Sequence, residues 1–192
     1  MKKVNKKKDI YQAAALLFGE KGYENTSLDE IAKKADVAKG TIFYYFNSKD
    51  ELFSDLVEEG INILSEEISK ITLQKKDIKE KLEKITEYHF SFFKEHAGVC
   101  LMILGQLGSF QKRWHKDANL IRTKYMSILE LLIQEGKKEK IINQYLDTEA
   151  VVVSLFSLLA VSGVDWAIFH PKMSKEKIID TTKLIMFNGI FS

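Results

Sequence analysis

Proline and cysteine are almost missing from this sequence of 192 residues, which contains one of each. A single cysteine excludes an internal disulfide framework. A single proline imposes few helix breaks, and the abundant lysine, glutamate, leucine and isoleucine favour helices over strands. The sequence therefore predicts an all-α protein that is long enough for one large or two small domains.

Signals for a membrane or for secretion are also weak. The uncharged run at residues 150–164 is shorter than the roughly 20 apolar residues that a bilayer requires. The lysine-rich N-terminus reaches Asp9 and Gln12 before a signal-like apolar stretch can build. We therefore expect a cytoplasmic protein with no membrane partner.

Catalytic and cofactor motifs are missing as well. The sequence contains no glycine-rich phosphate loop, no GxSxG and no HExxH, so we predict no enzyme and no cofactor. His96 and Cys100 would share a helix face with His89 nearby, but no carboxylate or CxxC accompanies them, which favours structural roles. Because Cys100 lies in an apolar run, its surroundings should raise the pKa of its thiol. A small helical metal-binding or enzymatic module stays open as the alternative.

Charge is distributed unevenly along the chain, although the net charge is only +2. Residues 1–49 contain ten lysines and six acidic residues, whereas the remainder has 19 basic and 21 acidic residues. The N-terminal end is therefore the candidate for binding a polyanion.

Helix signals are clear in the N-terminal third. Apolar residues from 10 to 18 recur at helical spacing, and Gly22 is the expected stop. The capping box SLDE at 27–30 opens a second helix, and KGTIFYYF at 39–46 forms a helix of barely two turns. A second capping box, SKDE at 48–51, opens a longer helix that reaches about residue 73.

Two short helices joined by a few residues are typical of a helix-turn-helix unit. At 100° per residue, Ile42 and Phe46 lie on the buried side of the second short helix. Tyr44, Tyr45 and the edge of Phe43 then face outward beside lysines. Hydroxyl and ammonium groups bind phosphate oxygens, and ring edges contact thymine methyls, so this surface suits the DNA major groove.

These residues resemble the TetR family of bacterial transcriptional regulators. The matching signature comprises LF at 17–18, GY at 22–23, TS at 26–27, IAKKADVAKGTIFYYF at 31–46 and SKDEL at 48–52. The resemblance implies a helix-turn-helix DNA-binding domain at residues 1–48. It also implies a larger helical domain at residues 49–192 that binds an effector and forms a homodimer.

The resemblance assigns phosphate contacts to Thr26 and Lys49 and base-reading positions to the second short helix. The complete predicted DNA-binding set is Thr26, Ser27, Lys39, Gly40, Thr41, Phe43, Tyr44, Tyr45 and Lys49. Three residues depart from the family pattern. Phe43 stands where tyrosine is usual, Asp36 where the turn usually has glycine, and Ala38 where serine usually caps the helix.

In the family, the effector pocket lies among the middle helices. Apolar and aromatic residue types there indicate a largely apolar or aromatic small-molecule effector. For any single residue, a place in the core is favoured over a place in the pocket. The lining candidates are Phe90, Phe93, Cys100, Met102, Leu104, Leu107, Phe110, Trp114, Tyr125 and Met126.

The last two predicted helices, at 147–169 and 174–190, carry apolar residues on more than one face. One face would pack inward and another would pair with the two-fold mate. A monomer with a deep core is the alternative. The predicted dimer interface is Val151, Val152, Leu155, Leu158 and Leu159.

Together, these features predict a ligand-responsive regulator, a repressor that binds palindromic double-stranded operator DNA as a dimer and is released by its effector. A non-specific DNA-packaging protein is a further alternative, against which the small net charge argues.

Overall fold

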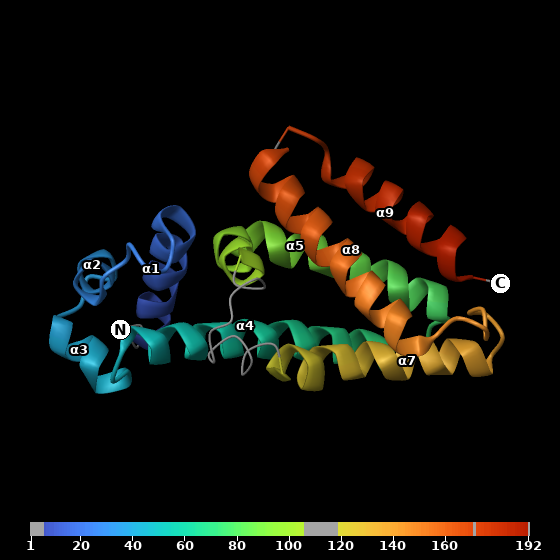
Figure 1. Ribbon diagram of the computed structural model, residues 1–192, viewed down its shortest axis with the longest axis horizontal. Coiled ribbons are helices and arrows are strands. Elements are labelled where there is room, and N and C mark those ends of the chain that lie inside the picture. Colours follow the sequence, from blue (N-terminus) through green and yellow to red (C-terminus); the bar gives the residue numbers. More distant parts are fainter. Residues whose placement is uncertain (1–5, 106–118, 171, 192) are drawn as a thin grey trace. The chain divides into compact units, whose positions relative to one another are not determined.

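The computed structural model describes residues 6–105, 119–170 and 172–191. These residues form eight α-helices and one π-helix, which confirms the all-α prediction (Figure 1). The elements are α1 (Lys6–Lys21), α2 (Leu28–Lys34), α3 (Lys39–Tyr45), α4 (Lys49–Thr72), α5 (Ile78–Gly105), η1 (Ile121–Met126), α7 (Ser127–Lys138), α8 (Thr148–Phe169) and α9 (Lys175–Ile190).

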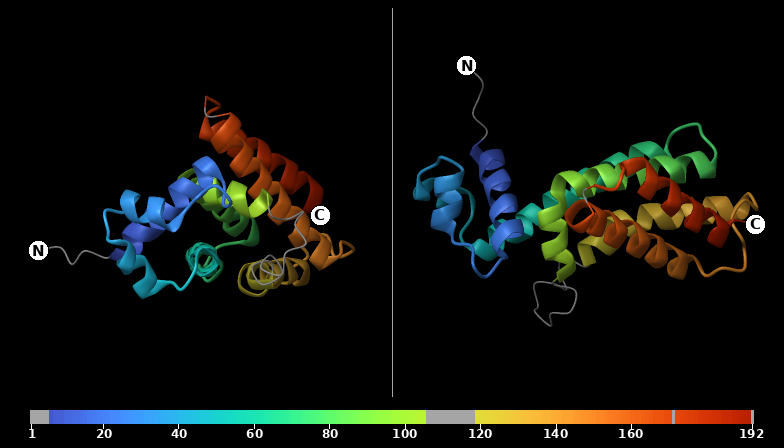
Figure 2. Two further views of the ribbon diagram at one scale, coloured as in Figure 1. Left: turned by 60° about the vertical axis from the view of Figure 1, so that its left-hand side comes forward. Right: turned by 90° about the horizontal axis from the view of Figure 1, so that it is seen from above.

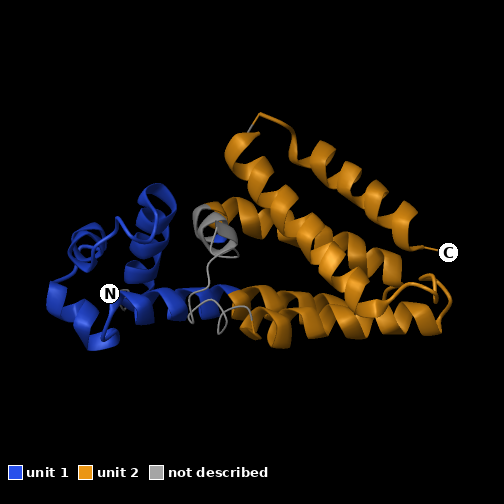
Figure 3. Cartoon of the chain, in the orientation of Figure 1, with its two compact units in different colours: residues 1–60, 98–117 blue, residues 61–97, 118–192 orange. Residues whose placement is uncertain are grey.

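The helices are divided between two compact units (Figure 3). Unit 1 contains residues 1–60 and a short segment that starts at residue 98, and unit 2 contains residues 61–97 and 118–192. The division falls within α4, and not at the end of the helix-turn-helix segment. Helix α4 therefore contributes residues to both units.

Unit 1 is built on the predicted helical spacing. Ile10, Ile31 and Ile42 are fully buried, and Phe18 and Phe46 are nearly so. The chain turns between these helices at two residues with positive φ, Gly22 and Asp36, at 79° and 52°. Glycine and aspartate tolerate this left-handed conformation better than most residues. The three short helices are thus held by one small apolar core.

Residues 78–97 of helix α5 belong to unit 2, where they run beside α8 (Figure 2). Gly163 of α8 lies so close to α5 that an added Cβ would come within 2.5 Å of the Phe93 ring. Ion pairs join α5 to α7, through Lys81 and Glu135 at 3.0 Å, and to α9, through Lys183 and Glu87 at 2.6 Å. Residues 78–97 of α5 are thereby held in unit 2 by both packing and ion pairs.

The sequence predicts one helix that starts at residue 77 and a second at 98–110, and the structure has a kink between them, with non-helical angles at His96 inside α5. A third helix is predicted from about Lys116 to Gly136, and within that range residues 121–126 form the π-helix η1. A π-helical turn places one extra residue in the turn, and hydrophobic spacing does not report it.

Helix α8 is apolar on all sides, and it is long and apolar enough to span a membrane by length and composition alone. Eight of its residues are buried within unit 2. The predicted dimer residues require a correction, because the chain itself buries Val151, Val152, Leu155 and Leu159 and half-buries Leu158. The apolar side chains that α8 exposes are Val153, Val161 and Phe169.

Candidate nucleic-acid interface and effector-domain interior

Helix α3 is anchored by two apolar side chains and presents its aromatic residues outward. Ile42 and Phe46 are 0% and 2% exposed, as the helical spacing predicted. Tyr44 is 81% exposed and Phe43 is 47% exposed. Tyr45 is half-buried, and its ring meets that of Tyr44 edge-on with centroids 5.0 Å apart. The structure therefore exposes Tyr44 and Phe43 as predicted, whereas Tyr45, which was predicted to face outward, is only partly exposed.

Gly40, in the first turn of α3, is not required by the fold. A Cβ at this position would meet no atom within 4 Å, and its φ does not lie in the left-handed region. Glycine in a helix costs about 1 kcal/mol relative to alanine, so the sequence accepts a less stable helix here. The absence of a side chain leaves the outer surface of α3 open for close approach by another molecule.

Lys39, the first residue of α3, is paired with an acidic residue of α2. Its Nζ lies 2.7 Å from Asp29 Oδ1, and both side chains are more than half exposed. The Lys39 ammonium also lies 6.0 Å from the centroid of the Phe43 ring. Asp29 therefore competes with any phosphate or base for this lysine.

We expect Asp29→Asn to raise affinity for DNA by about 2- to 5-fold, because it releases Lys39 and removes a negative charge beside the phosphates. Fluorescence anisotropy with duplex DNA at several salt concentrations would measure this. Glu139→Gln, the same charge change on an exposed residue of unit 2, is the control. Equal affinities for Asp29→Asn and the control would show that Lys39 is not a DNA ligand.

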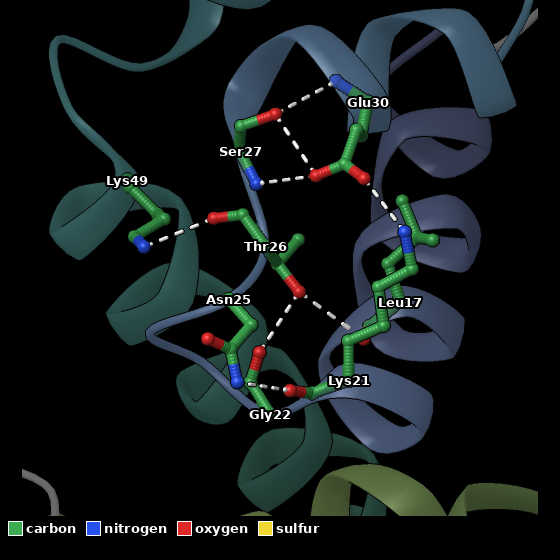
Figure 4. Close-up of polar contacts among 8 residues, drawn as sticks. All are labelled: Leu17, Lys21, Gly22, Asn25, Thr26, Ser27, Glu30 and Lys49. Carbon is green, nitrogen blue, oxygen red and sulfur yellow. Dashed lines mark hydrogen bonds and ion pairs between the residues drawn. The ribbon is translucent and has the colours of Figure 1, made fainter.

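Thr26 and Lys49, which were predicted to contact phosphates, instead direct their side chains to backbone carbonyls of the turn (Figure 4). Thr26 is 2% exposed, and its hydroxyl donates to the Leu17 and Gly22 carbonyls at 3.2 and 2.9 Å. Lys49 Nζ donates to the Tyr23 and Thr26 carbonyls, both at 2.9 Å. In this conformation these two side chains stabilise the loop between α1 and α2.

Ser27 is the N-cap of α2, as the capping box predicted (Figure 4). Its hydroxyl accepts from the Glu30 N–H at 3.2 Å, and the Glu30 carboxylate accepts from the Ser27 N–H at 3.0 Å. The Lys21 ammonium, followed by the bonds from Ser27, lowers the pKa of Glu30 to about 2. The second box differs, because the Glu51 carboxylate accepts from the Asn47 N–H.

Two tyrosine–aspartate contacts that sequence patterns do not reveal fasten α4 within unit 1. The Tyr11 hydroxyl donates to Asp55, which also pairs with Lys7 at 2.9 Å. The Tyr23 hydroxyl donates to Asp50 at 2.5 Å. Burial and then the neighbouring carboxylate of Asp55 raise the pKa of Tyr11 to about 12. The first turns of α4 are therefore tied to α1 and to the loop before α2.

A buried polar pair lies inside unit 2 among the candidate effector residues. The Tyr125 hydroxyl and His89 Nε2 are 2.7 Å apart, and His89 Nδ1 lies 2.7 Å from the Ile85 carbonyl. A carbonyl only accepts, so Nδ1 carries the proton and Nε2 accepts from Tyr125. Burial lowers the pKa of His89 to about 4, so the ring is neutral. Both ring nitrogens are thus engaged in hydrogen bonds.

Four other predicted effector residues have side chains in the described part of the chain. Phe93 packs against His89 with centroids 5.6 Å apart, and Phe90 meets Trp166 at 5.9 Å. Cys100 is buried, which raises the pKa of its thiol to about 12, and Met126 is half-buried. Sequence reasoning missed Phe156, which packs on Tyr125 at 5.6 Å. The side chains of Met102, Leu104, Leu107, Phe110 and Trp114 lie outside the described part of the chain.

The helix-turn-helix geometry and the helical second unit agree with comparisons to known families. Residues 10–56 match bacterial regulatory proteins of the tetR family, and residues 57–189 match the C-terminal region of YsiA-like proteins. The chain therefore belongs to the TetR family of bacterial transcriptional regulators, and it is a helix-turn-helix regulator.

Three of the relatives that match nearly the whole chain are regulators of fatty acid metabolism or degradation. The fatty acid metabolism regulator protein of Bacillus subtilis is 25% identical, with 94% of this chain and 93% of the relative covered. The solved fatty acid degradation regulator FadR of Bacillus halodurans is 26% identical with a TM-score of 0.84, covering 95% and 98%. FadR of Bacillus subtilis in complex with stearoyl-CoA is 26% identical with a TM-score of 0.81, covering 95% and 98%.

Proposed function

We propose that this protein is a cytoplasmic repressor that binds a palindromic operator as a homodimer and is released by a long-chain acyl-CoA. The observation that carries the proposal is the outward face of α3, where Tyr44 and Phe43 are exposed beside the open position of Gly40. Rings and a bare backbone on a short anchored helix fit the major groove.

An exposed apolar surface on the last two helices supports the homodimer. Helices α8 and α9 contact each other within unit 2 (Figure 1). Phe169 and Val161 of α8 are 64% and 55% exposed, and Leu184 and Ile185 of α9 are 62% and 57% exposed. Large apolar side chains that are exposed on neighbouring helices are typical of an interface. Pairing of this face with a second copy would bury them and set two α3 helices on one operator.

The acyl-CoA proposal rests on the apolar interior of unit 2 and on the relative bound to stearoyl-CoA. Phe90, Phe93 and Tyr125 give this interior the apolar and aromatic character that an acyl chain requires. Helix α4 is one continuous helix that contributes residues to both units. An effector that changes the position of α4 would move the two α3 helices away from their groove spacing.

Selection of bound fragments from a random double-stranded DNA library tests the operator, and anisotropy with the selected site then tests the effector. We expect a two-fold symmetric site, and saturating stearoyl-CoA should weaken binding by roughly 5- to 150-fold, the range of typical allosteric coupling. Coenzyme A without an acyl chain is the control and should weaken operator binding much less than stearoyl-CoA does. A site without symmetry would contradict the dimeric repressor, and unchanged binding with stearoyl-CoA would contradict the effector.

A further inference from the structure

A shallow groove lies between α4 and η1 in unit 2. Its volume is about 440 Å³, and it is lined by Asn62, Ser65, Glu66, Ser69, Lys70 and Lys124. Asn62 is three and four positions before Ser65 and Glu66, and Ser69 follows these two at the same spacings, so all four share one face of α4. The neighbouring face of the same helix carries the buried residues Ile61, Leu64 and Ile68. The groove is therefore lined by polar residues of a helix whose neighbouring face is buried.

Ser65 is unusual for a residue on such a surface. The residue is only 8% exposed, and within the described chain its hydroxyl oxygen is buried without a hydrogen-bond partner. A buried hydroxyl without a partner is unfavourable, and native proteins leave few such groups. A ligand oxygen in the groove would give this hydroxyl an acceptor after a rotation about its side-chain bond.

The other lining groups are mainly hydrogen-bond donors. Lys124 Nζ donates to Asn62 Oδ1 at 2.8 Å. The Asn62 side chain can therefore offer a ligand only its amide N–H groups, which are donors. Lys70 pairs with Glu67 at 3.2 Å on the exposed surface, a weak contact that a ligand anion can replace. Two ammonium groups, an amide and serine hydroxyls are the donors that phosphate oxygens accept from.

We propose that this groove is a phosphate-binding site that receives the phosphates of the coenzyme A headgroup. The claim that the phosphates belong to coenzyme A depends on the proposed acyl-CoA effector. The claim that the groove binds phosphate depends only on the residues that line it. Lys124 and Lys70 supply the charge, Asn62 and Ser65 supply neutral donors, and Glu66 limits the affinity by repulsion. Occupation of the groove would add to the contact that Lys124 of η1 already makes with Asn62 of α4, and η1 also carries the buried Tyr125.

Titration calorimetry of the full-length protein with three probes tests this site: stearoyl-CoA, stearate and inorganic pyrophosphate. The variants are Lys70→Gln/Lys124→Gln and Ser65→Ala, and the control is Lys75→Gln/Lys138→Gln, which removes the same charge at exposed positions. We expect the first variant to weaken stearoyl-CoA and pyrophosphate binding by about 10-fold or more, and Ser65→Ala by less. Stearate binding should be unchanged, and Glu66→Gln should tighten pyrophosphate binding.

The outcomes separate this site from the proposed effector. If stearoyl-CoA binds and neither it nor pyrophosphate is weakened in the double variant, the groove proposal is overturned and the effector stands. If pyrophosphate depends on the groove but stearoyl-CoA does not bind at all, the phosphate site is supported, its phosphate comes from another source, and the acyl-CoA effector fails.

Discussion

Replacing Tyr44 with alanine is expected to weaken binding to the selected operator by about 30-fold or more. A good base contact is worth roughly 1–3 kcal/mol, and a dimer loses it in both half-sites. Because the side chain is 81% exposed and Ile42 and Phe46 anchor α3, the free energy of unfolding should change by less than about 0.5 kcal/mol. Anisotropy with labelled operator and urea denaturation measure the two quantities.

Tyr145 offers a matched control, because it is 88% exposed and lies in unit 2. Tyr145→Ala should leave operator binding unchanged. Tyr44→Phe separates the two parts of the Tyr44 side chain, since it removes the hydroxyl contact to phosphate and keeps the ring. Wild-type affinity for Tyr44→Ala would mean that the exposed face of α3 does not read DNA.

Stability is expected to fall steeply in acid because of His89. Burial lowers the pKa of His89 to about 4, whereas the unfolded side chain titrates near its ordinary value of 6.5. Between these values the unfolded chain binds more protons than the folded chain, so the free energy of unfolding rises with pH. This contribution is fully present above pH 6.5, and about 3 kcal/mol of it is lost on acidification to pH 4.

Urea denaturation at fixed protein concentration between pH 4 and 8 measures this effect. The double variant His89→Phe/Tyr125→Phe removes the titrating ring without leaving the Tyr125 hydroxyl unpaired. Its pH profile should be flatter than that of the wild type across pH 4–6.5. Replacement of the exposed His170 by glutamine is the control and should leave the wild-type slope. An equal slope in the double variant would show that other groups cause the acid sensitivity.

The sequence did not predict well which side chains of the candidate sites are available to a ligand at the surface. The family pattern assigned phosphate contacts to Thr26 and Lys49, yet both side chains bind backbone carbonyls. Hydroxyl and ammonium groups donate equally well to a carbonyl and to a phosphate, so residue type does not decide between them. The His89–Tyr125 pair was invisible for another reason, because its members lie 36 residues apart.

The sequence by itself determined the local features of this protein: the Ser27–Glu30 capping box, the turn at Asp36 and the buried side of α3. Each depends on hydrogen bonds or spacing within about four residues. Only the tertiary structure decided which side chains of α8 are exposed and which lysines line the α4 groove. An all-apolar helix has no preferred face of its own, so long-range packing selects the residues that are buried and the residues left for a partner.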